Sequence, residues 1–540
     1  MRRKLYTFHF ALYTLGAALA VFAASAAPKF VAHGWDLLDA PPEALAERAD
    51  ALCAAGIDGV AIVLPSTEQS DGTVVSAISL PQDAAWRYET VAKYERPLKA
   101  LSSHPQLTDN FLISLWNFRR GRLGLTDDDA WARFANNLRV LARLAKRSGM
   151  KGLMIDAEDY TKVRQFHCVA GDPEYDEAAR LARRRGREVF SGVFEEFPDV
   201  TLLSFWFFTQ EGSALRFSDP AAKVRAEKSL WPHFLNGMLD AMPMTATFVD
   251  GDEGAYKYDS PAAFNASAVC QLVSAISLVA PENRDKFRAR ARIGFGQYLD
   301  MYVNEEGKSG SWYFGPVAGS RLEHFRRNLA SAAGLADYVW IYGEKRSWID
   351  WGEKAPFRKT RGFSHRATWE SALPGLAGVL AELRDPQRAA VRLADDLRAA
   401  GATNLYTANL RRRWAAPKDS LAAFTMTDGT PDSLVVSNVP DAAFHVPVDG
   451  VREGDVFVAD FRLEGDTDGV AEVIWRTDGP FNWSLGRHYM VSFTAEGNGA
   501  KRFSRIFHAP AGADGLMFRV NVRQLPGERT VFKDIAIYRK

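Results

Sequence analysis

From residue 29 to about 350, short apolar runs alternate with longer stretches in which apolar residues recur at helical spacing. The longer stretches include PPEALAERADALCAAG and DDDAWARFANNLRVLARLAKRSG, and both end in Gly, as helices often do. The short runs are rich in β-branched and aromatic residues, which favours strands. The eight predicted strands are residues 30–36, 58–64, 110–117, 151–156, 200–208, 244–250, 292–299 and 337–343.

Eight successive strand–helix units predict an α/β fold, a (β/α)8 TIM barrel of parallel strands. An open doubly wound sheet is the alternative, and a dinucleotide-binding sheet of that kind carries a G-x-G-x-x-G loop after its first strand. Here the first predicted strand runs into HGWDLLDAPP, and no Walker-type phosphate loop occurs. We therefore favour the barrel, and we place it at residues 29–400 with an extra helix at its C-terminal end.

The pattern changes after the barrel. Residues 401–420 form a predicted connector, and short alternating runs separated by Gly, Asp and Pro follow from about 421. Such runs are typical of an all-β antiparallel sandwich. We expect residues 421–540 to form a jelly-roll-like domain of this kind.

The N-terminus has the pattern of a signal peptide. A basic start at Arg2, Arg3 and Lys4 precedes an apolar run, and Ala24-Ser25-Ala26 fits a small-x-small cleavage site. We predict a signal peptide over residues 1–26 and a secreted or periplasmic protein; an uncleaved anchor is the alternative.

Composition narrows the classes of partner. Lys plus Arg is 67 and Asp plus Glu is 66, so no charge excess favours nucleic acid or an anionic membrane. The 14 Trp, 16 Tyr and 34 Phe include a surplus that suits sugar-binding surfaces. The three widely spaced cysteines favour neither a disulfide framework nor a zinc site. We expect a carbohydrate substrate, no nucleic acid, no membrane association after signal cleavage and no protein partner.

Acidic residues follow several predicted strands. In GLMIDAEDY, residues 152–160, a strand runs into Asp156, Glu158 and Asp159. In a (β/α)8 barrel the active site lies at the C-terminal ends of the strands, so acids that recur there are expected to meet. Paired carboxylates suit the cleavage of glycosidic bonds, with one acting as acid and the other as base or nucleophile.

Four carboxylates are the catalytic candidates. Glu158 is the predicted general acid, because like charges beside it disfavour its ionisation. Asp156 could assist it or act as nucleophile. Asp250 or Glu344 is the predicted second carboxylate, and a pair of Asp156 with Asp250 is an alternative.

The other strand-end residues are candidates for substrate binding. Aromatic faces suit the C–H faces of sugar rings, and we expect His33 to be scaffold. In the sandwich, Trp475, Phe481 and Trp483 could form a sugar platform, although packing is the favoured interpretation. The substrate-binding candidates in the barrel are Trp35, Trp116, Trp206, Asp252, Tyr298, Asp300, Trp340, Tyr342 and Trp348.

Other chemistries have little support in the sequence. The chain has 10 His, with no H-x-H and no H-E-x-x-H pattern, which argues against metal hydrolysis. No G-x-S-x-G occurs, which argues against a serine nucleophile. We predict no cofactor and no metal.

With these motifs the chain resembles secreted glycoside hydrolases that have a (β/α)8 catalytic domain. The resemblance rests on Asp156-x-Glu158, on Asp250-x-Asp252-Glu253 and on YVWIYGEKRSW at 338–348. The ending FKDIAIYR, residues 532–539, is similar to the last strand of a jelly-roll carbohydrate-binding module. The Asn-Glu pair of many retaining enzymes is absent, because Ala157 precedes Glu158, and only the final Asp-x-Glu of the chitinase-like motif is matched.

The resemblance implies a glycoside hydrolase acting on an oligo- or polysaccharide. The first alternative is a non-catalytic glycan-binding protein, which would keep the aromatic groove without paired carboxylates. A weaker alternative is an enzyme of different chemistry on the same scaffold, since fold does not fix function.

Overall fold

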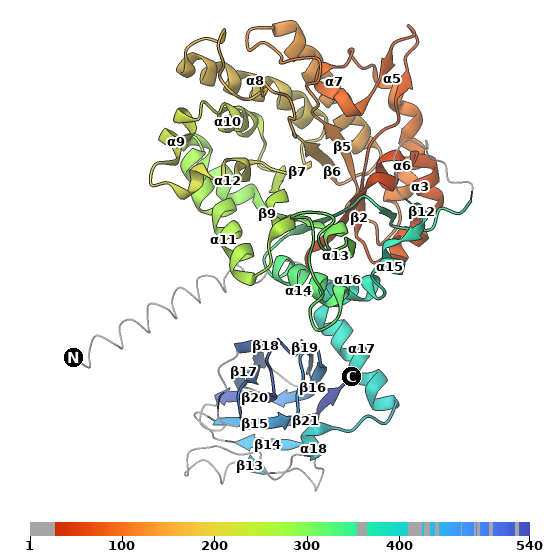
Figure 1. Cartoon of the computed structure of the whole chain (residues 1–540), viewed down its shortest axis with the longest axis vertical. Helices are drawn as coiled ribbons and strands as arrows, with labels where there is room; N and C mark the ends of the chain where they lie inside the picture. Colours follow the sequence, from red (N-terminus) through yellow and green to blue (C-terminus); the bar gives the residue numbers. More distant parts are fainter. Residues whose placement is uncertain are drawn as a thin grey trace, which may run out of the picture. The chain divides into compact units, whose positions relative to one another are not determined.

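The computed structural model divides the chain into two compact units (Figure 1). It describes residues 27–353, 364–408, 424–425, 433–437, 442–465, 467–479, 482, 486–495, 501–523 and 529–540. The predicted signal peptide at 1–26 lies outside the described residues, as do Phe481 and Trp483. The first unit runs to Gly315 and includes His324–Leu380, whereas 316–323 and 381–540 belong to the second.

The first unit is a closed barrel of eight strands in the order β1-β10-β9-β8-β7-β6-β5-β2, and each neighbouring pair is parallel. The predicted (β/α)8 fold and all eight predicted strands are confirmed. The strands are β1 (Lys29–Gly34), β2 (Gly59–Ile62), β5 (Phe111–Leu115), β6 (Gly152–Asp156), β7 (Thr201–Ser204), β8 (Thr247–Asp250), β9 (Ala291–Tyr298) and β10 (Tyr338–Gly343).

Helices follow the strands, and two short strand pairs extend the loops, β3 (Thr67–Glu68) with β4 (Val74–Val75) and β11 (Arg346–Ser347) with β12 (Ser364–Thr368). The α-helices up to residue 384 are α2 (Trp35–Asp39), α3 (Pro42–Glu47), α4 (Ala49–Ala54), α5 (Tyr88–Val91), α6 (Glu95–Ser102), α7 (Asp128–Arg147), α8 (Tyr175–Glu196), α9 (Pro220–Ala226), α10 (Trp231–Ala241), α11 (Pro261–Leu272), α12 (Arg284–Arg290), α13 (Asp300–Val303), α14 (Arg321–Ala333), α15 (Trp369–Ala372) and α16 (Leu376–Arg384). The 3-10 helices are η1 (Ala77–Gln82), η2 (Ala92–Tyr94), η3 (Phe208–Glu211), η4 (Ala214–Arg216), η5 (Glu253–Lys257), η6 (Ser274–Leu278) and η7 (Pro281–Asn283).

Helix α7 illustrates how local signals form the outer layer. Its N-cap Asp127 accepts a hydrogen bond from the Ala130 N–H at 3.0 Å, and acids in the first turn and bases in the last turn oppose the helix dipole. Its apolar side, including Trp131 and Phe134, is buried. Helix α8 packs against both α7 and α10 outside the strands (Figure 1).

An aromatic pair of the first unit lies where β7 ends. Trp340 of β10 is fully buried and stacks on Phe205, with ring centroids 4.4 Å apart and planes inclined by 5°. The Trp340 Nε1–H donates to the Gly251 carbonyl at 2.8 Å, just after β8. Burial of both rings therefore links β10 to the segments that follow β7 and β8, where the acidic motifs lie.

The second unit contains two antiparallel sheets that enclose an apolar core, as the predicted sandwich requires. Their orders are β13-β14-β21-β16-β19 and β15-β20-β17-β18. Trp475 is fully buried in this core, so it is a packing residue and offers no face to a sugar. The strands are β13 (Phe424–Thr425), β14 (Leu434–Ser437), β15 (Ala442–Asp449), β16 (Val456–Gly465), β17 (Thr467–Arg476), β18 (Gly486–Ala495), β19 (Lys501–His508), β20 (Gly515–Arg523) and β21 (Arg529–Arg539).

Two helices accompany the sheets, α17 (Pro386–Ala399) and α18 (Leu405–Ala408). Ala390 and Ala394 of α17 are buried against Val458 and Tyr538. The extra helix that the sequence analysis assigns to the end of the barrel domain thus packs on the sandwich.

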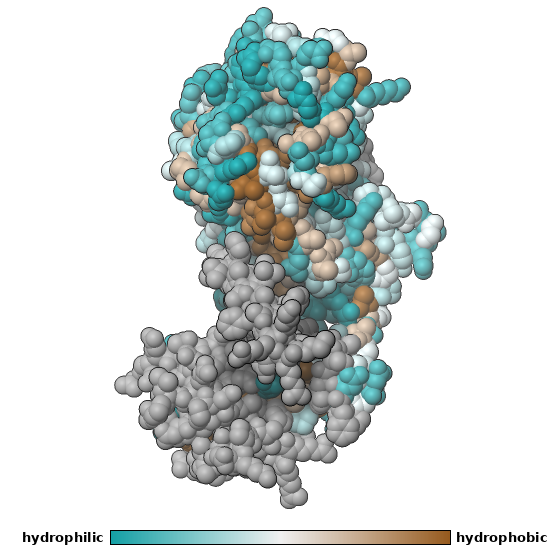
Figure 2. Space-filling view, turned by 90° about the vertical axis from the view of Figure 1, so that its left-hand side faces the viewer, coloured by the Kyte–Doolittle hydropathy of each residue, from teal (hydrophilic) through white to brown (hydrophobic). Residues whose placement is uncertain are grey.

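One outer helix of the barrel unit is notably apolar. By length and composition alone, Pro261–Leu278, which joins α11 to η6, would suffice to cross a membrane, a test that core helices of soluble proteins also pass. Val269 and Val273 are exposed, and Figure 2 shows a hydrophobic area on a face that is otherwise largely hydrophilic.

Candidate active site

Three carboxylates at the C-terminal ends of the strands influence one another electrostatically. They are Asp156 and Glu158, which end β6 and begin its loop, and Glu253, which begins η5 after β8. The charges of Asp156 and Glu158 both raise the pKa of Glu253. Residues from two strand ends therefore form one acidic cluster, called here the carboxylate cluster.

Asp156 is held by its own loop. Its Oδ1 accepts a hydrogen bond from the Glu158 N–H at 3.0 Å. Burial, and secondarily the charge of Glu158, raises the pKa of Asp156 to about 7. The strand end thus places this carboxyl group where its ionisation is disfavoured.

Glu158 is half-buried, and burial raises the pKa of its carboxyl group above the ordinary value. An interaction with the Tyr160 hydroxyl opposes part of this rise. The charge of Glu158 in turn helps to raise the pKa of both Asp156 and Glu253.

Glu253 is the member with the most raised pKa, about 9, first because of burial and then because of Glu158 and Asp156. Its position follows from the backbone: Asp252 has a left-handed φ of 32°, and the Glu253 N–H donates to the Phe205 carbonyl at 3.1 Å. The turn that ends β8 therefore carries Glu253 to the cluster, where it keeps its proton at neutral pH.

The two acids that precede Glu253 have structural partners. Both oxygens of buried Asp250 are engaged, by the Phe207 N–H at 3.0 Å and by the N–H and hydroxyl of Thr209. Asp252 accepts hydrogen bonds from the hydroxyls of Tyr258 and Ser267. Asp250 therefore holds the loop after β7, and its expected role as second carboxylate stays a prediction. Glu253, which follows β8, is the acid whose pKa Glu158 raises.

Two further aspartates tie loops in the same way. Asp36 accepts hydrogen bonds from the Trp348 N–H at 2.8 Å and the Trp351 Nε1–H at 3.2 Å. Asp300, fully buried, accepts the Glu344 N–H at 2.7 Å. Asp300 therefore positions the loop after β10 and offers no surface to substrate.

Glu344 belongs to a tyrosine wall. Its Oε1 accepts the Tyr342 hydroxyl at 3.0 Å, and its charge helps to raise the pKa of Tyr298. Tyr298 stacks on Tyr342 at 5.4 Å, and Tyr256, whose ring is 5.3 Å from Tyr298, is one of the groups beside Glu253. The wall thus extends from Glu344 to the carboxylate cluster.

Buried aromatic residues account for several predicted sugar platforms. Trp116 is 1% exposed among Phe134 and other core rings, Trp340 is fully buried, and Trp348 is 3% exposed. These three are core residues, which corrects their predicted role. Trp35 and Trp206 are half-buried at strand ends, as are Tyr298 and Tyr342. His33, buried and stacked on Tyr342 at 4.9 Å, is scaffold.

The structure exposes two aromatic side chains that the sequence analysis did not select. Trp312 is 41% exposed, lies edge-on to Tyr298 at 5.7 Å and receives Lys257 over its ring at 4.3 Å. Tyr160, beside Glu158, is 82% exposed. Both lie next to residues of the site, and both fit the apolar faces of sugars.

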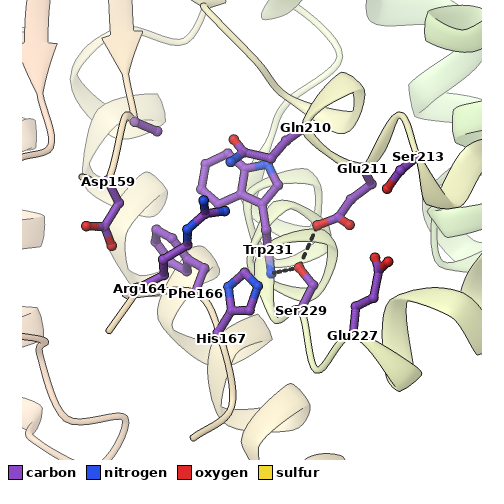
Figure 3. Close-up of a pocket in the computed structure, with 11 residues that line it drawn as sticks. Asp159, Arg164, Phe166, His167, Gln210, Glu211, Ser213, Glu227, Ser229 and Trp231 are labelled. Atoms are coloured by element: carbon purple, nitrogen blue, oxygen red, sulfur yellow. Dashed lines mark hydrogen bonds between the residues drawn. The ribbon is translucent and has the colours of Figure 1, made fainter. Parts of the chain in front are cut away.

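A cavity of about 410 Å³ borders the loop that follows β6. Figure 3 shows the residues that line it. Ala157, which lies between Asp156 and Glu158 in the chain, forms part of its lining. The remaining lining residues come from the loops after β6 and β7 and from the start of α10: Asp159, Arg164, Phe166, His167, Gln210, Glu211, Ser213, Glu227, Ser229 and Trp231.

Within the described part of the chain, no group of three or more His, Cys, Asp or Glu side chains has the arrangement of a metal site. Cys53, Cys168 and Cys270 are all free thiols.

Comparisons with known proteins find only partial matches among solved structures. No family model matches this chain, and no curated protein matches it. Among solved structures, the CBM22-1–GH10 modules of endo-1,4-β-D-xylanase 10B from Clostridium thermocellum match at 12% identity over 21% of this chain and 23% of that chain, with a TM-score of 0.18. An arabinose-bound MgGH51 α-L-arabinofuranosidase matches at 15% identity over 26% of each chain, with a TM-score of 0.18.

A further match is the enzymatically active domain of tailspike protein 4 from bacteriophage CBA120, with 16% identity, 20% of this chain, 15% of that chain and a TM-score of 0.16. The neighbours thus include glycoside hydrolases and carbohydrate-binding modules, but the chain spans only a small part of the multidomain ones. The fold assignment stands on the strand order of this chain.

Proposed function

We propose that the protein is a glycoside hydrolase that cleaves an oligo- or polysaccharide by carboxylate catalysis. The observation that carries the proposal is the carboxylate cluster, in which three acids from two strand ends share a site where they cannot all ionise near neutral pH. Pairs of carboxyl groups with separated pKa values are the arrangement that glycosidic cleavage requires.

The charge distribution suggests the role of each acid. Glu253 retains a proton at neutral pH and is proposed to protonate the leaving oxygen. Glu158, whose charge raises the pKa of Glu253, is proposed as nucleophile or as the base that activates water. The acid role that the sequence analysis gives to Glu158 therefore passes to Glu253, and Asp156 assists by holding Glu158 and by its charge.

Aromatic side chains near the cluster supply the proposed subsites. Trp312 and Tyr160 are exposed, and Trp35, Trp206 and Tyr342 are half-buried. Sugar rings bury C–H faces on such surfaces and place hydroxyls toward polar neighbours such as Glu344.

The non-catalytic alternative requires a groove that lacks paired carboxylates. The three acids support the enzyme instead, because a protein that only binds glycan gains nothing from burying acids beside one another. Export completes the proposal, on the basis of the basic and apolar residues 2–24 and the Ala24-Ser25-Ala26 site.

The test is a glycan screen for released reducing ends with the parent protein, Glu158→Gln, Glu253→Gln and Glu344→Gln. We expect release by the parent, loss in the first two variants and partial retention in the third. Full activity in Glu253→Gln would move the acid to another residue. Binding of a glycan without release by the parent would favour the non-catalytic protein.

A further inference from the structure

The cavity beside the carboxylate cluster is large enough for a ligand. Its volume of about 410 Å³ falls within the range of roughly 300–1,000 Å³ that small-molecule sites occupy. Ala157 is in its wall, so the cavity borders the loop that carries Glu158. The size and position of the cavity therefore suit a subsite for one sugar unit.

The acids that line the cavity already have hydrogen-bond donors or a cation. Asp159 accepts the Gln165 N–H at 2.6 Å and the N–H and hydroxyl of Thr161. Glu211 accepts the Ser229 hydroxyl at 2.5 Å, and Glu227 pairs with Lys223 at 2.9 Å. Neutral donors therefore hold Asp159 and Glu211 in place, and a lysine pairs with Glu227.

Arg164 is the positively charged residue in the lining of the cavity. Within the described part of the chain its guanidinium forms no ion pair, whereas neighbouring Arg122 pairs with Asp172 at 3.0 Å. Figure 3 shows the Arg164 side chain extending into the cavity near Gln210 and Trp231. His167 adds no positive charge at neutral pH, because burial and the two arginines lower its pKa.

We propose that the cavity binds an anionic substituent of the glycan, the carboxylate of a uronic acid unit or a sulfate ester, in a subsite next to the cleaved bond. The proposal rests on the proposed glycosidase function and names its substrate class. A guanidinium binds carboxylate or sulfate oxygens through two parallel N–H bonds. The Gln210 amide and the His167 ring are neutral groups that can donate to the same anion.

The test compares a polyuronide with its carboxyl-reduced form, in which each carboxylate is a primary alcohol, and a sulfated glycan with its desulfated form. We expect the parent to prefer one anionic substrate by roughly 10- to 100-fold in kcat/KM, the size of a charge-assisted contact. Arg164→Gln should lose this preference without losing activity on the neutral form. Arg164→Lys should keep part of it, since it keeps the charge but not the fork.

Lys162→Gln is the matched control, because Lys162 is an exposed cation two residues away that does not line the cavity. If Lys162→Gln and Arg164→Gln lost the preference for the anionic substrate equally, general electrostatic attraction would explain the preference and the subsite would be overturned. Whether the uronate or the sulfate carries the preference identifies the anion.

Binding separates this inference from the proposed function. Calorimetry of Glu158→Gln with a uronate and a sulfated oligosaccharide, with and without Arg164→Gln, needs no turnover. Arg164-dependent binding without hydrolysis by the parent would support the subsite and contradict the glycosidase. Hydrolysis of neutral glycans, with no effect of Arg164→Gln on any substrate, would support the glycosidase and contradict the subsite.

Discussion

The Glu158 backbone N–H donates a hydrogen bond to Asp156 Oδ1 at 3.0 Å, which fixes the two carboxylates of β6 in one short loop. An Asn at position 156 can still accept this bond, whereas an Ala cannot. We therefore expect Asp156→Ala to lose far more activity than Asp156→Asn. Measuring kcat/KM for both variants tests the role of Asp156 in orienting Glu158, and equal losses would contradict it.

Asp156→Asn should also change the pH dependence of the activity. The charge of Asp156 is one cause of the raised pKa of Glu253, so removing it should lower that pKa. The alkaline limb of the kcat/KM profile, which we assign to deprotonation of Glu253, should move to lower pH. An unmoved limb would show that Glu253 is not the proton donor.

Glu253→Gln should abolish most of the turnover without unfolding the protein. General acid catalysis contributes roughly 100- to 10,000-fold, so we expect a loss in that range. The matched control is Asp252→Asn, whose partners are the hydroxyls of Tyr258 and Ser267, which can reorient to suit an amide. That variant should retain much more activity than Glu253→Gln in the same assay.

The difference in stability between Glu253→Gln and the parent should depend on pH. In the unfolded chain Glu253 ionises near its ordinary pKa of 4.5, while in the folded protein it keeps its proton to about 9. The contribution of Glu253 to the free energy of unfolding is therefore highest below pH 4.5 and falls as pH rises toward 9, by at most about 1.4 kcal/mol per pH unit. Urea unfolding should find the two proteins equally stable near pH 4 and the Gln variant more stable at pH 8. A difference that is constant with pH would contradict this titration.

Asp250→Asn should cost stability rather than chemistry. The two backbone N–H groups of Phe207 and Thr209 donate to different oxygens of Asp250, and an amide replaces one of these acceptors by a donor. We expect a loss of about 1–3 kcal/mol, the cost of a buried group left without its partner. Thermal unfolding measures it, and unchanged stability with lost activity would restore Asp250 as a catalytic candidate.

Two tryptophans should respond oppositely to truncation. Trp340→Ala removes a fully buried ring stacked on Phe205 and should cost about 3–5 kcal/mol of stability. Trp312 is 41% exposed, so Trp312→Ala should leave stability within about 1 kcal/mol and raise KM for the glycan. Unfolding curves and steady-state kinetics distinguish the two roles.

The fold was predictable because its signals are periodic. Strand-length apolar runs and helical spacing were enough for the eight-stranded barrel and the following sandwich. The site depends on single backbone angles, which the spacing of hydrophobic residues in the sequence does not reveal. The left-handed φ of Asp252 redirects the chain after β8, and Glu253 is the acid of this turn whose pKa Glu158 and Asp156 raise.

Burial of aromatic residues was equally hard to anticipate. Trp340 and Trp312 both belong to aromatic stretches near strand ends, yet one is enclosed and the other is open. What separates them is tertiary packing, since Trp340 stacks on Phe205, just after β7, and Trp312 lies in an irregular loop. Composition can predict that some aromatic platform exists, but not which ring supplies it.

Asp36 and Asp300 both accept hydrogen bonds from backbone N–H groups of the loop after β10, and Asp250 accepts two from the loop after β7. In each case the aspartate lies at the end of another strand than the one that the loop follows. A loop can therefore be replaced on this scaffold only together with the aspartate that binds its backbone. A new segment after β7 has to present N–H groups to Asp250, and one after β10 has to satisfy both Asp36 and Asp300. Homologous recombination that exchanges single βα units would break these contacts, whereas exchange of neighbouring units together would preserve them.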